Sequence, residues 1–285
     1  MNGFLTHFLT TLKLNLRNKQ AMIFGYLVPV FFLIAFGSLY KTRPALVREI
    51  GQILTISVLG GACFGMPVAL VSERERGVWR RYRLMPISPL WLLASTMLAR
   101  YVIVLTSALL QIGLAMWWYK MPAPENPFML WVAFSCTAFA FLGLGLIIAA
   151  VSNTTGAVQA MGQVVFLPMI IIGGVGVAMR LLPVWAQYVA TFLPGRYAVE
   201  AMNAGVMVLK EDKDGLQMQR WYFHLGALLV MGIATSLIGA KLFRWESAQR
   251  LPRSTYFYVF AGLLLWACVG GAALHWNMAR IFVVK

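Results

Sequence analysis

Residues 73–86 read ERERGVWRRYRLMP and place five arginines between two apolar stretches, residues 50–72 and 101–119. Within this segment only Glu73 and Glu75 oppose that positive charge. Each flanking stretch holds enough apolar residues to cross a bilayer, because a core of about 30 Å needs roughly 20 helical residues. Since cationic loops stay on the cytoplasmic side of a membrane, we expect residues 73–86 to lie at the cytoplasmic surface.

The same pattern extends over the whole chain. Apolar residues make up 60% of the 285 positions and charged residues only 12%, whereas a soluble domain carries about 25% charged residues. The charge-free runs lie at residues 21–40, 50–72, 101–119, 127–151, 156–179, 221–240 and 256–276. They lack the alternation of barrel strands, so the sequence predicts an all-α polytopic membrane protein.

The net charge of +15 does not indicate nucleic acid as a partner, because the basic residues flank the spans and would face anionic lipid. Cys63, Cys136 and Cys268 fall within apolar runs, which is typical of small buried side chains rather than of disulfides or metal ligands. The first apolar run is too long for the core of a signal peptide and lacks a small-residue cleavage site after it. We therefore expect no cleavable signal peptide.

Residues 1–20 predict an amphipathic interface helix before the first span. Phe4, Phe8 and Leu12 recur at helical spacing and basic residues follow them, so this helix is expected to lie on the cytoplasmic face. A frayed tail is the alternative, which the apolar stripe disfavours. With the N-terminus cytoplasmic, the inside loops are 73–100, 152–155 and 241–255, and the outside loops are 41–49, 120–126 and 180–220. Lys and Arg are almost equally numerous on the two sides, so the density of cations in the inside loops supports this topology.

Residues 183–209 are apolar but interrupted by Pro183 and Pro194. Each piece is too short to span, so we expect two re-entrant helices that dip into the outer leaflet among other protein segments. Arg196 and Glu200 lie four positions apart and can form an ion pair on one helix face. The alternative is a full span, which would move the basic loop 241–255 to the outside.

No segment carries the chemistry of nucleotide hydrolysis or metal binding. The phosphate-binding pattern G-x-x-x-x-G-K-[ST] is absent, and His7, His224 and His275 lie far apart at the edges of the apolar runs. The predicted spans contain no Asp, Glu, Lys or Arg, which disfavours ion-driven transport, although sodium sites built from carbonyl groups stay open. We expect no catalytic residue, no metal site and no cofactor in this chain.

Polar uncharged residues inside the runs are candidates for a translocation path. Gln159 and Gln163 share a helix face, Gln111 lies in the middle of the third run, and Pro168 is expected to kink the fifth. Hydrogen bonding between helices explains the glutamines equally well. The sequence leaves both interpretations open.

The segment 73–86 also has the composition of a docking helix. Val78, Trp79 and Tyr82 are interleaved with the arginines, so one face is apolar and the other cationic. Pro86 and Pro89 would end such a helix. Arginine offers planar multidentate contacts at protein interfaces, which favours docking to a soluble protein over a solvated linker or contact with lipid headgroups.

Two stretches resemble the membrane permease subunit of ABC-2 type exporters: ERERGVWRRYRLMPISPLWLLAS at residues 73–95 and LPVWAQYVATFLPGRYAVEAM at residues 182–202. The first is similar to the stretch that carries that family's coupling helix, the second to its paired outer helices. The resemblance covers residues 1 to about 245. It implies a six-helix type-2 exporter domain at residues 21–245, whereas residues 246–285 add a basic loop and a seventh apolar run that either spans or lies against the membrane.

By this resemblance, two permease copies would work with two copies of an ABC ATPase subunit, which would hold ATP and Mg. The implied coupling interface consists of Glu73, Arg74, Glu75, Arg76, Gly77, Trp79, Arg80, Arg81, Arg83 and Pro86, with Trp79 anchored in a groove of the ATPase. Few polar groups line the runs, which favours an amphipathic small molecule, lipid or lipid-linked cargo. The alternatives are an ion-driven secondary transporter or channel, and an intramembrane enzyme, which would need clustered ionisable residues that the runs lack.

Overall fold

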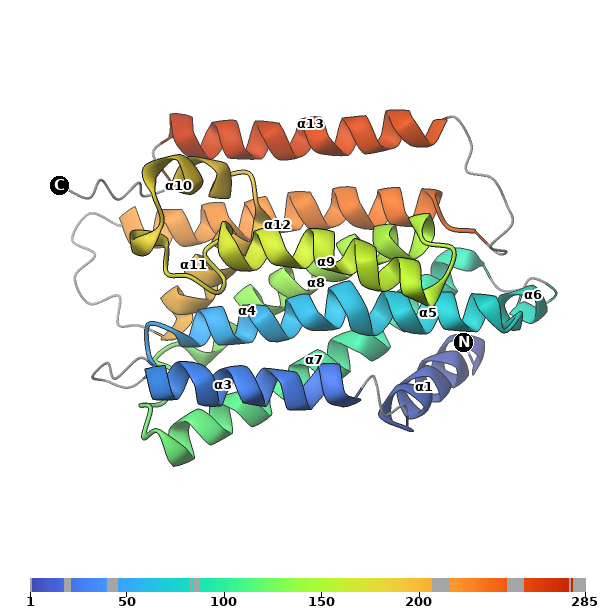
Figure 1. Ribbon diagram of the computed structural model, residues 1–285, viewed down its shortest axis with the longest axis horizontal. Coiled ribbons are helices and arrows are strands. Elements are labelled where there is room, and N and C mark those ends of the chain that lie inside the picture. The colour runs from blue at the N-terminus through green and yellow to red at the C-terminus, as the bar shows by residue number, and fades with distance from the viewer. Residues whose placement is uncertain are drawn as a thin grey trace.

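The computed structural model describes residues 2–17, 22–39, 46–82, 84, 88–206, 216–244, 254–276 and 278. Within this part of the chain every regular element is a helix, and no strand occurs. The long helices run side by side along one axis, and the connections gather at the two ends of the bundle (Figure 1). The fold is therefore that of a multi-pass helical membrane protein.

The helices follow the chain in the order α1 (Asn2–Arg17), η1 (Ile23–Leu27), α3 (Val28–Leu39), α4 (Ile50–Gly60), η2 (Gly61–Gly65), α5 (Met66–Glu75), α6 (Val78–Tyr82), α7 (Pro89–Trp118), α8 (Pro127–Val151), α9 (Thr155–Ile171), η3 (Met179–Leu181), α10 (Val184–Ala190), α11 (Pro194–Val206), α12 (Leu216–Lys241) and α13 (Ser254–His275).

Five described helices are long and apolar enough to cross a membrane: Ile50–Glu75, Pro89–Trp118, Pro127–Val151, Gln217–Lys241 and Phe257–His275. Two of the seven apolar runs form shorter apolar helices, Gly25–Leu39 and Thr155–Ile171. The run at 156–179 does not stay helical to its end, because Gly174 adopts a φ of 75° soon after α9 stops.

The third apolar run belongs to a longer helix than residues 101–119. α7 begins at Pro89, and Ser88 before it is extended. Proline suits the first helical position because it has no amide hydrogen that would need a partner there. Arg100 therefore lies inside a membrane-length helix. The expectation that the spans contain no charged residue is wrong at this position.

The second apolar run forms one continuous rod, in which α4, η2 and α5 follow each other without a break from Ile50 to Glu75. Its middle section, Gly61–Gly65, is π-helical, and a second π-helical section, Ile23–Leu27, begins the first run. Such sections are rare and frequently mark functional sites.

The centre of the bundle is α8, which packs against α4, α5, α11 and α12. Glycines bring the backbones of α8 and α12 close together: a Cβ at Gly143 would lie 2.9 Å from the amide nitrogen of Ser236, and one at Gly239 would lie 3.2 Å from that of Ile147. Small residues at helix crossings are typical of membrane bundles, where packing drives association.

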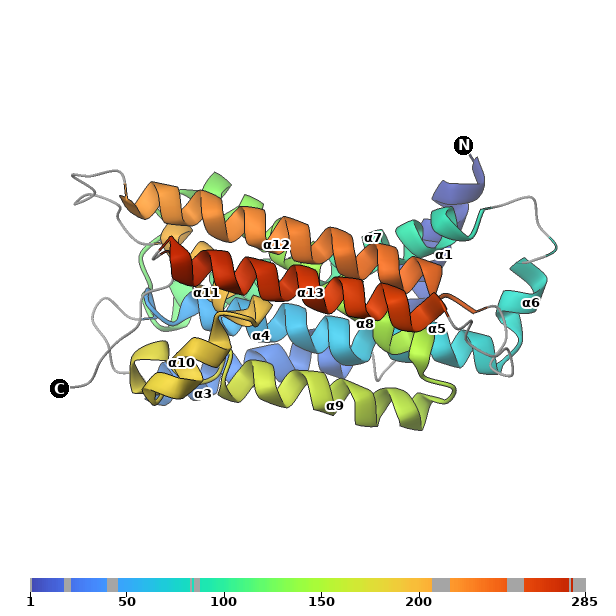
Figure 2. The ribbon, with the colours of Figure 1, turned by 90° about the horizontal axis from the view of Figure 1, so that it is seen from above.

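The two ends of the bundle differ in content. α1, α6, the α8–α9 turn and the end of α12 meet at one end, and the hairpin of α10 and α11 lies at the other (Figures 1 and 2). These are the groups of loops that the sequence assigned to opposite sides. α13 lies on the outside of the bundle along α12 (Figure 1), and its exposed apolar side chains include Phe257, Phe260, Leu263 and Leu264.

Candidate functional site

The arginine-rich segment forms two helices joined by a turn rather than one helix over 73–86. α5 ends at Glu75 and α6 begins at Val78. Between them Gly77 has a φ of 72°, a conformation that glycine adopts without a Cβ penalty. The Gly77 amide donates to the carbonyl oxygen of Arg74 at 3.0 Å, which closes the end of α5. The turn carries α6 past the end of the bundle (Figure 1).

Arg74 points into the bundle. Its side chain is buried, and its Nη2 donates to the carbonyl oxygen of Ala149 at 3.0 Å and to that of Ser152. These carbonyls end α8, where the helix offers them no amide partner and its dipole favours cations. Arg74 therefore ties α5 to α8, and its side chain is not positioned for the direct contact with an ATPase that the sequence suggested.

Arg244, just beyond α12, binds the same end of α8. Its Nε and Nη2 both donate to the carbonyl oxygen of Ala150, at 3.0 and 2.7 Å, and Nη2 also donates to Oδ1 of Asn153 at 2.9 Å. Two arginines from elements far apart in sequence thus satisfy one helix end. Arg74 and Arg244 fix α5, α8 and α12 to each other where the segment 73–86 leaves the bundle.

Trp79 is buried within its own chain at 1% exposure. Its ring packs against Phe243, with centroids 4.8 Å apart, and against Tyr82 at 5.7 Å. Tyr82 in turn packs edge-on against His7 at 5.2 Å. We call Trp79, Tyr82, Phe243 and His7 the aromatic cluster. The structure thus gives Trp79 a place inside this chain, where it packs α6 against Phe243 beyond the end of α12, instead of the expected place in a partner's groove. Tyr82 connects α6 to α1.

α1 lies against the first turns of α7. His7 Nδ1 is 2.5 Å from Ser95 Oγ, and Phe4 packs edge-on against Trp91 with centroids 5.5 Å apart. The exposed large apolar side chains of α1 are Leu5, Leu9, Leu14 and Leu16. A helix that docks through one face and still exposes apolar side chains suits the boundary between membrane and water.

Burial also changes two titrating groups of the aromatic cluster. It lowers the pKa of His7 below its ordinary value of 6.5, because the imidazolium form loses hydration. Burial, together with the nearby carboxylate of Glu73, raises the pKa of Tyr82. Both shifts favour the neutral side chain, which suits an aromatic contact.

The rest of the segment is directed outward. The exposed side chains between residues 75 and 84 are those of Glu75, Arg76, Arg80, Arg81 and Leu84. We call Arg76, Arg80, Arg81 and Leu84 the arginine patch. Leu84 is 88% exposed, so the patch combines three cations with an apolar side chain. Arg83 and Pro86 of the predicted interface lie outside the described residues.

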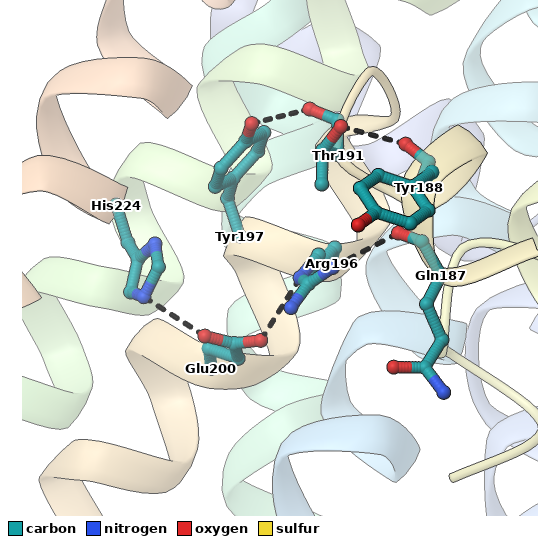
Figure 3. A network of polar contacts seen from close by, with 7 residues as sticks. All are labelled: Gln187, Tyr188, Thr191, Arg196, Tyr197, Glu200 and His224. Atoms are coloured by element: carbon teal, nitrogen blue, oxygen red, sulfur yellow. Dashed lines mark hydrogen bonds and ion pairs between the residues drawn. The ribbon is translucent and has the colours of Figure 1, made fainter. Parts of the chain in front are cut away.

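A polar network occupies the opposite end of the molecule. Arg196 and Glu200, one turn apart on α11, form an ion pair with Nε 3.1 Å from Oε1. Oε2 of Glu200 is 3.0 Å from His224 Nε2 on α12, and Arg196 Nη1 donates to the carbonyl oxygen of Gln187 on α10 at 3.0 Å (Figure 3). We call Gln187, Arg196, Glu200 and His224 the outer network; it joins three helices.

Hydrogen bonds within the α10–α11 hairpin hold this network in place. The hydroxyl of Tyr197 donates to the carbonyl oxygen of Thr191, and the hydroxyl of Thr191 donates to the carbonyl oxygen of Tyr188 at 2.7 Å (Figure 3). The sequence predicted the pairing of Arg196 with Glu200 but not the contribution of His224. That residue is 24 positions from Glu200, and no spacing rule relates positions on separate helices.

The candidate path residues lie on two helices, Gln111 on α7 and the other three on α9. Gln111 is buried, and its Nε2 donates to Ser57 Oγ at 2.6 Å and to the carbonyl oxygen of Ser107 at 3.0 Å. This is a hydrogen bond between α7 and α4, one of the two interpretations that the sequence left open. On α9, Gln159 is half-buried and Gln163 is exposed. Pro168 lies in the last turn of α9, which stops at Ile171.

Reasoning from the sequence missed Arg100. Its side chain is 1% exposed, and its guanidinium lies against Gly65 of η2. Only the length of α7 could have revealed its position, because the charge itself ended the apolar run in which the span was sought. Among the described residues, no cluster of three or more His, Cys, Asp or Glu side chains could hold a metal ion.

Comparison with known proteins identifies one family. The family model described as "ABC-2 type transporter" matches residues 3–207, which is more than half of the chain and ends at the last turn of α11. No curated protein and no solved structure matches. The match includes the arginine patch and all of the outer network except His224.

Proposed function

Because the chain belongs to the ABC-2 type transporter family, we propose that it is the membrane-spanning subunit of an exporter driven by a separate ATPase. It would move an amphipathic cargo across the cytoplasmic membrane, with its N-terminus on the cytoplasmic side. The observation that carries this proposal is the arginine patch, which projects from one end of a bundle of membrane-length helices.

The arginine patch would be the contact with the ATPase. Guanidinium groups of Arg76, Arg80 and Arg81 would bind carboxylates and carbonyl oxygens of the partner, and Leu84 would supply an apolar anchor. Arg74 and Trp79 would act behind this surface. Arg74 on α5 is hydrogen-bonded to the end of α8, and Trp79 on α6 packs against Phe243 just beyond α12. A force applied to α6 would therefore reach α5, α8 and α12 together.

The rod from Ile50 to Glu75 offers a route for that force to the far end. At its start Asn203 of α11 accepts a hydrogen bond from the Gly51 amide at 3.0 Å and donates to the carbonyl oxygen of Arg48 at 3.1 Å. Arg196 and Glu200 of the outer network are on the same short helix α11. A shift of the rod along its axis would therefore strain the hairpin of α10 and α11. We propose that this hairpin is the outer gate of the path.

A second copy of the chain would complete the path. α9 supports this arrangement because Gln163 and several apolar side chains on it are exposed in the single chain. Nε2 of Gln111 donates its hydrogen bonds within the chain, so we assign the path to α9 rather than to Gln111. In this proposal Gln159 and Gln163 face the partner copy.

The test is co-purification from native membranes with charge reversal in the patch. The wild-type chain is expected to bring down an ATPase in stoichiometric amount, and R80E/R81E is expected to lose about tenfold or more of it, since about 1.4 kcal/mol of lost contact energy is tenfold in affinity. R48E is the matched control, because Arg48 is an exposed arginine at the other end of the rod. Equal recovery of an ATPase by all three chains would refute the docking surface.

An ion-driven transporter or channel is the competing hypothesis, and Arg100 is the observation that keeps it in view, because ionisable residues inside membrane helices often mark ion paths. Transport measurements in sealed vesicles distinguish the two hypotheses. Transport that persists without ATP and collapses with the ion gradient would favour the carrier, whereas dependence on ATP would favour the exporter.

A further inference from the structure

Arg100 is a buried cation that forms no hydrogen bond with the residues that the structure describes. Its side chain is 1% exposed, and within the described part of the chain Nε, Nη1 and Nη2 have no hydrogen-bond partner. Among the described residues no acidic side chain forms an ion pair with it. Arginine keeps its charge in proteins, and buried charges are otherwise paired or hydrogen-bonded. A fully desolvated guanidinium with three unsatisfied nitrogens therefore calls for an anion that is not part of this chain.

The surroundings of Arg100 are shaped to receive its guanidinium. Gly61 and Gly65 of η2 face it: a Cβ at Gly65 would overlap the guanidinium, and one at Gly61 would lie 3.5 Å from its Nε. The second π-helical section, Ile23–Leu27, contacts both η2 and α7. Two irregular helical sections thus meet α7 around one charged side chain, and such sections often accompany binding sites.

The depth of Arg100 distinguishes it from a residue that binds resting lipid headgroups. It lies 11 positions after the start of α7, or about 16 Å along the helix, and about 27 Å from its other end. Gly65 lies ten positions before the end of α5, which gives about 15 Å. With a hydrocarbon core of about 30 Å centred on such helices, the guanidinium lies inside the core, in the half nearer the arginine patch. An anion that reaches it has left the headgroup layer.

An exposed hydroxyl contact joins η1 to α7. Tyr26 of η1 interacts electrostatically with Arg100, and its hydroxyl is 2.7 Å from Oγ1 of Thr106 on α7, in an exposed position. Separation of this pair would open the seam between η1 and α7 toward the membrane. The neighbours of Arg100 on α7, Ile103 and Val104, are buried and apolar, which suits a ligand with a hydrocarbon body.

From these observations we propose that Arg100 binds the phosphate-bearing headgroup of an amphipathic molecule that enters from the inner leaflet between η1 and α7, and that this structure shows the closed form of the site. The inference rests on the proposed function and narrows it, because it names an anionic amphiphile as the cargo class. A guanidinium matches phosphate because its planar nitrogens donate two parallel hydrogen bonds, and it does so most strongly where water is excluded.

The test measures lipid binding to the purified chain alone, without any ATPase. Native mass spectrometry from detergent micelles would count dioleoylphosphatidic acid retained per chain, with dioleoylphosphatidylcholine as the competitor. The wild type is expected to prefer phosphatidic acid. In R100M and R100Q this preference is expected to fall by about tenfold, because one bidentate phosphate contact is lost. R48M is the control and is expected to keep the preference of the wild type. Addition of inorganic phosphate is expected to displace little lipid, whereas full displacement would assign the site to a soluble anion and overturn the proposal.

Thermal unfolding of the same proteins separates a binding role from a structural one. Replacement of an unpaired buried charge by an apolar side chain of similar size is neutral or stabilising, so R100M is expected to unfold at the wild-type temperature or above it. Retention of phosphatidic acid by folded R100M or R100Q would overturn the proposal. So would the failure of both variants to fold, because the arginine would then be structural. If the wild-type chain bound phosphatidic acid as expected but brought down no ATPase, the exporter assignment would be refuted and the lipid-binding result would stand.

Discussion

The centroid of the Trp79 ring lies 4.8 Å from that of Phe243, so α6 packs against the segment that follows α12. The two residues are far apart in sequence, yet together with His7 and Tyr82 they join α1, α6 and the end of α12. This contact makes the arginine patch part of the bundle. A surface held in this way can transmit a force, whereas a solvated loop could not.

Truncation of Trp79 should separate α6 from the bundle. Trp79→Ala is expected to lower the free energy of unfolding by about 3–5 kcal/mol, the range for removal of a large buried aromatic side chain. Thermal unfolding in detergent would measure it. Trp117→Ala is the control, because that ring is 71% exposed and faces away from the core. Equal shifts in the two variants would contradict the role given to the aromatic cluster.

Arg74 and Arg244 should show coupled effects on stability. Either change to Ala leaves carbonyls at the end of α8 without a donor, which costs about 1–3 kcal/mol for each variant. Because both side chains close the same helix end, the double variant is expected to deviate from the sum of the single ones. A double-mutant cycle by thermal unfolding tests this, with Arg48→Ala as the exposed control. Strict additivity would mean that the two caps act independently.

The outer network should be more sensitive to loss of its anion than to loss of the whole pair. Glu200→Ala leaves Arg196 buried without its carboxylate, which typically costs about 3–5 kcal/mol. The paired replacement R196M/E200L removes both charges and is expected to cost less. Unfolding temperatures of the two variants decide the matter, with the exposed Glu125→Ala as control. A double variant that is less stable than Glu200→Ala would show that the ion pair is net stabilising.

The docking of α1 should weaken in acid. Burial lowers the pKa of His7 below 6.5, so the unfolded chain binds a proton more readily than the folded one. The contribution of neutral His7 to stability is therefore complete above pH 6.5 and is lost as the pH falls through the lower, folded pKa. Limited proteolysis of α1 is expected to be faster at pH 5.5 than at pH 7.5.

His7→Gln is the matched variant for that experiment. It keeps a polar side chain opposite Ser95 but cannot titrate, so its rate of cleavage should be the same at both pH values. If the variant kept the acid sensitivity of the wild type, another group would control the docking of α1.

Much of the helical layout follows from the sequence, because it depends on local properties. Each of the seven apolar runs contains a helix, although in the run at 156–179 α9 ends at Ile171, and Pro183 and Pro194 mark the starts of the two short helices of the hairpin. The sharp turn after α5 is at Gly77, the glycine within the segment 73–86. Hydropathy and the backbone preferences of proline and glycine depend on residues close together in the sequence, so they can be predicted from it.

The candidate site was harder to predict because burial depends on neighbours distant in sequence. The helical pattern showed that Trp79 and the arginines lie on different faces, but not that Phe243 would cover the tryptophan. It could not show that Arg74 would meet the end of α8. Arg100 was not predicted for a different reason: the charge-free run begins only after it, at residue 101, whereas the helix begins at Pro89.

The place of α13 restricts how two such chains can associate. The helix runs along α12, where Gly262 fits against Ile238 (Figure 2). Gly270 of α13 fits against Phe192, which lies between α10 and α11. A domain that stopped at α12 would offer this flank to a second subunit. Here it is already taken by a segment that the family match does not include. In the proposed two-copy arrangement, the second copy would therefore have to pack along another side of the molecule.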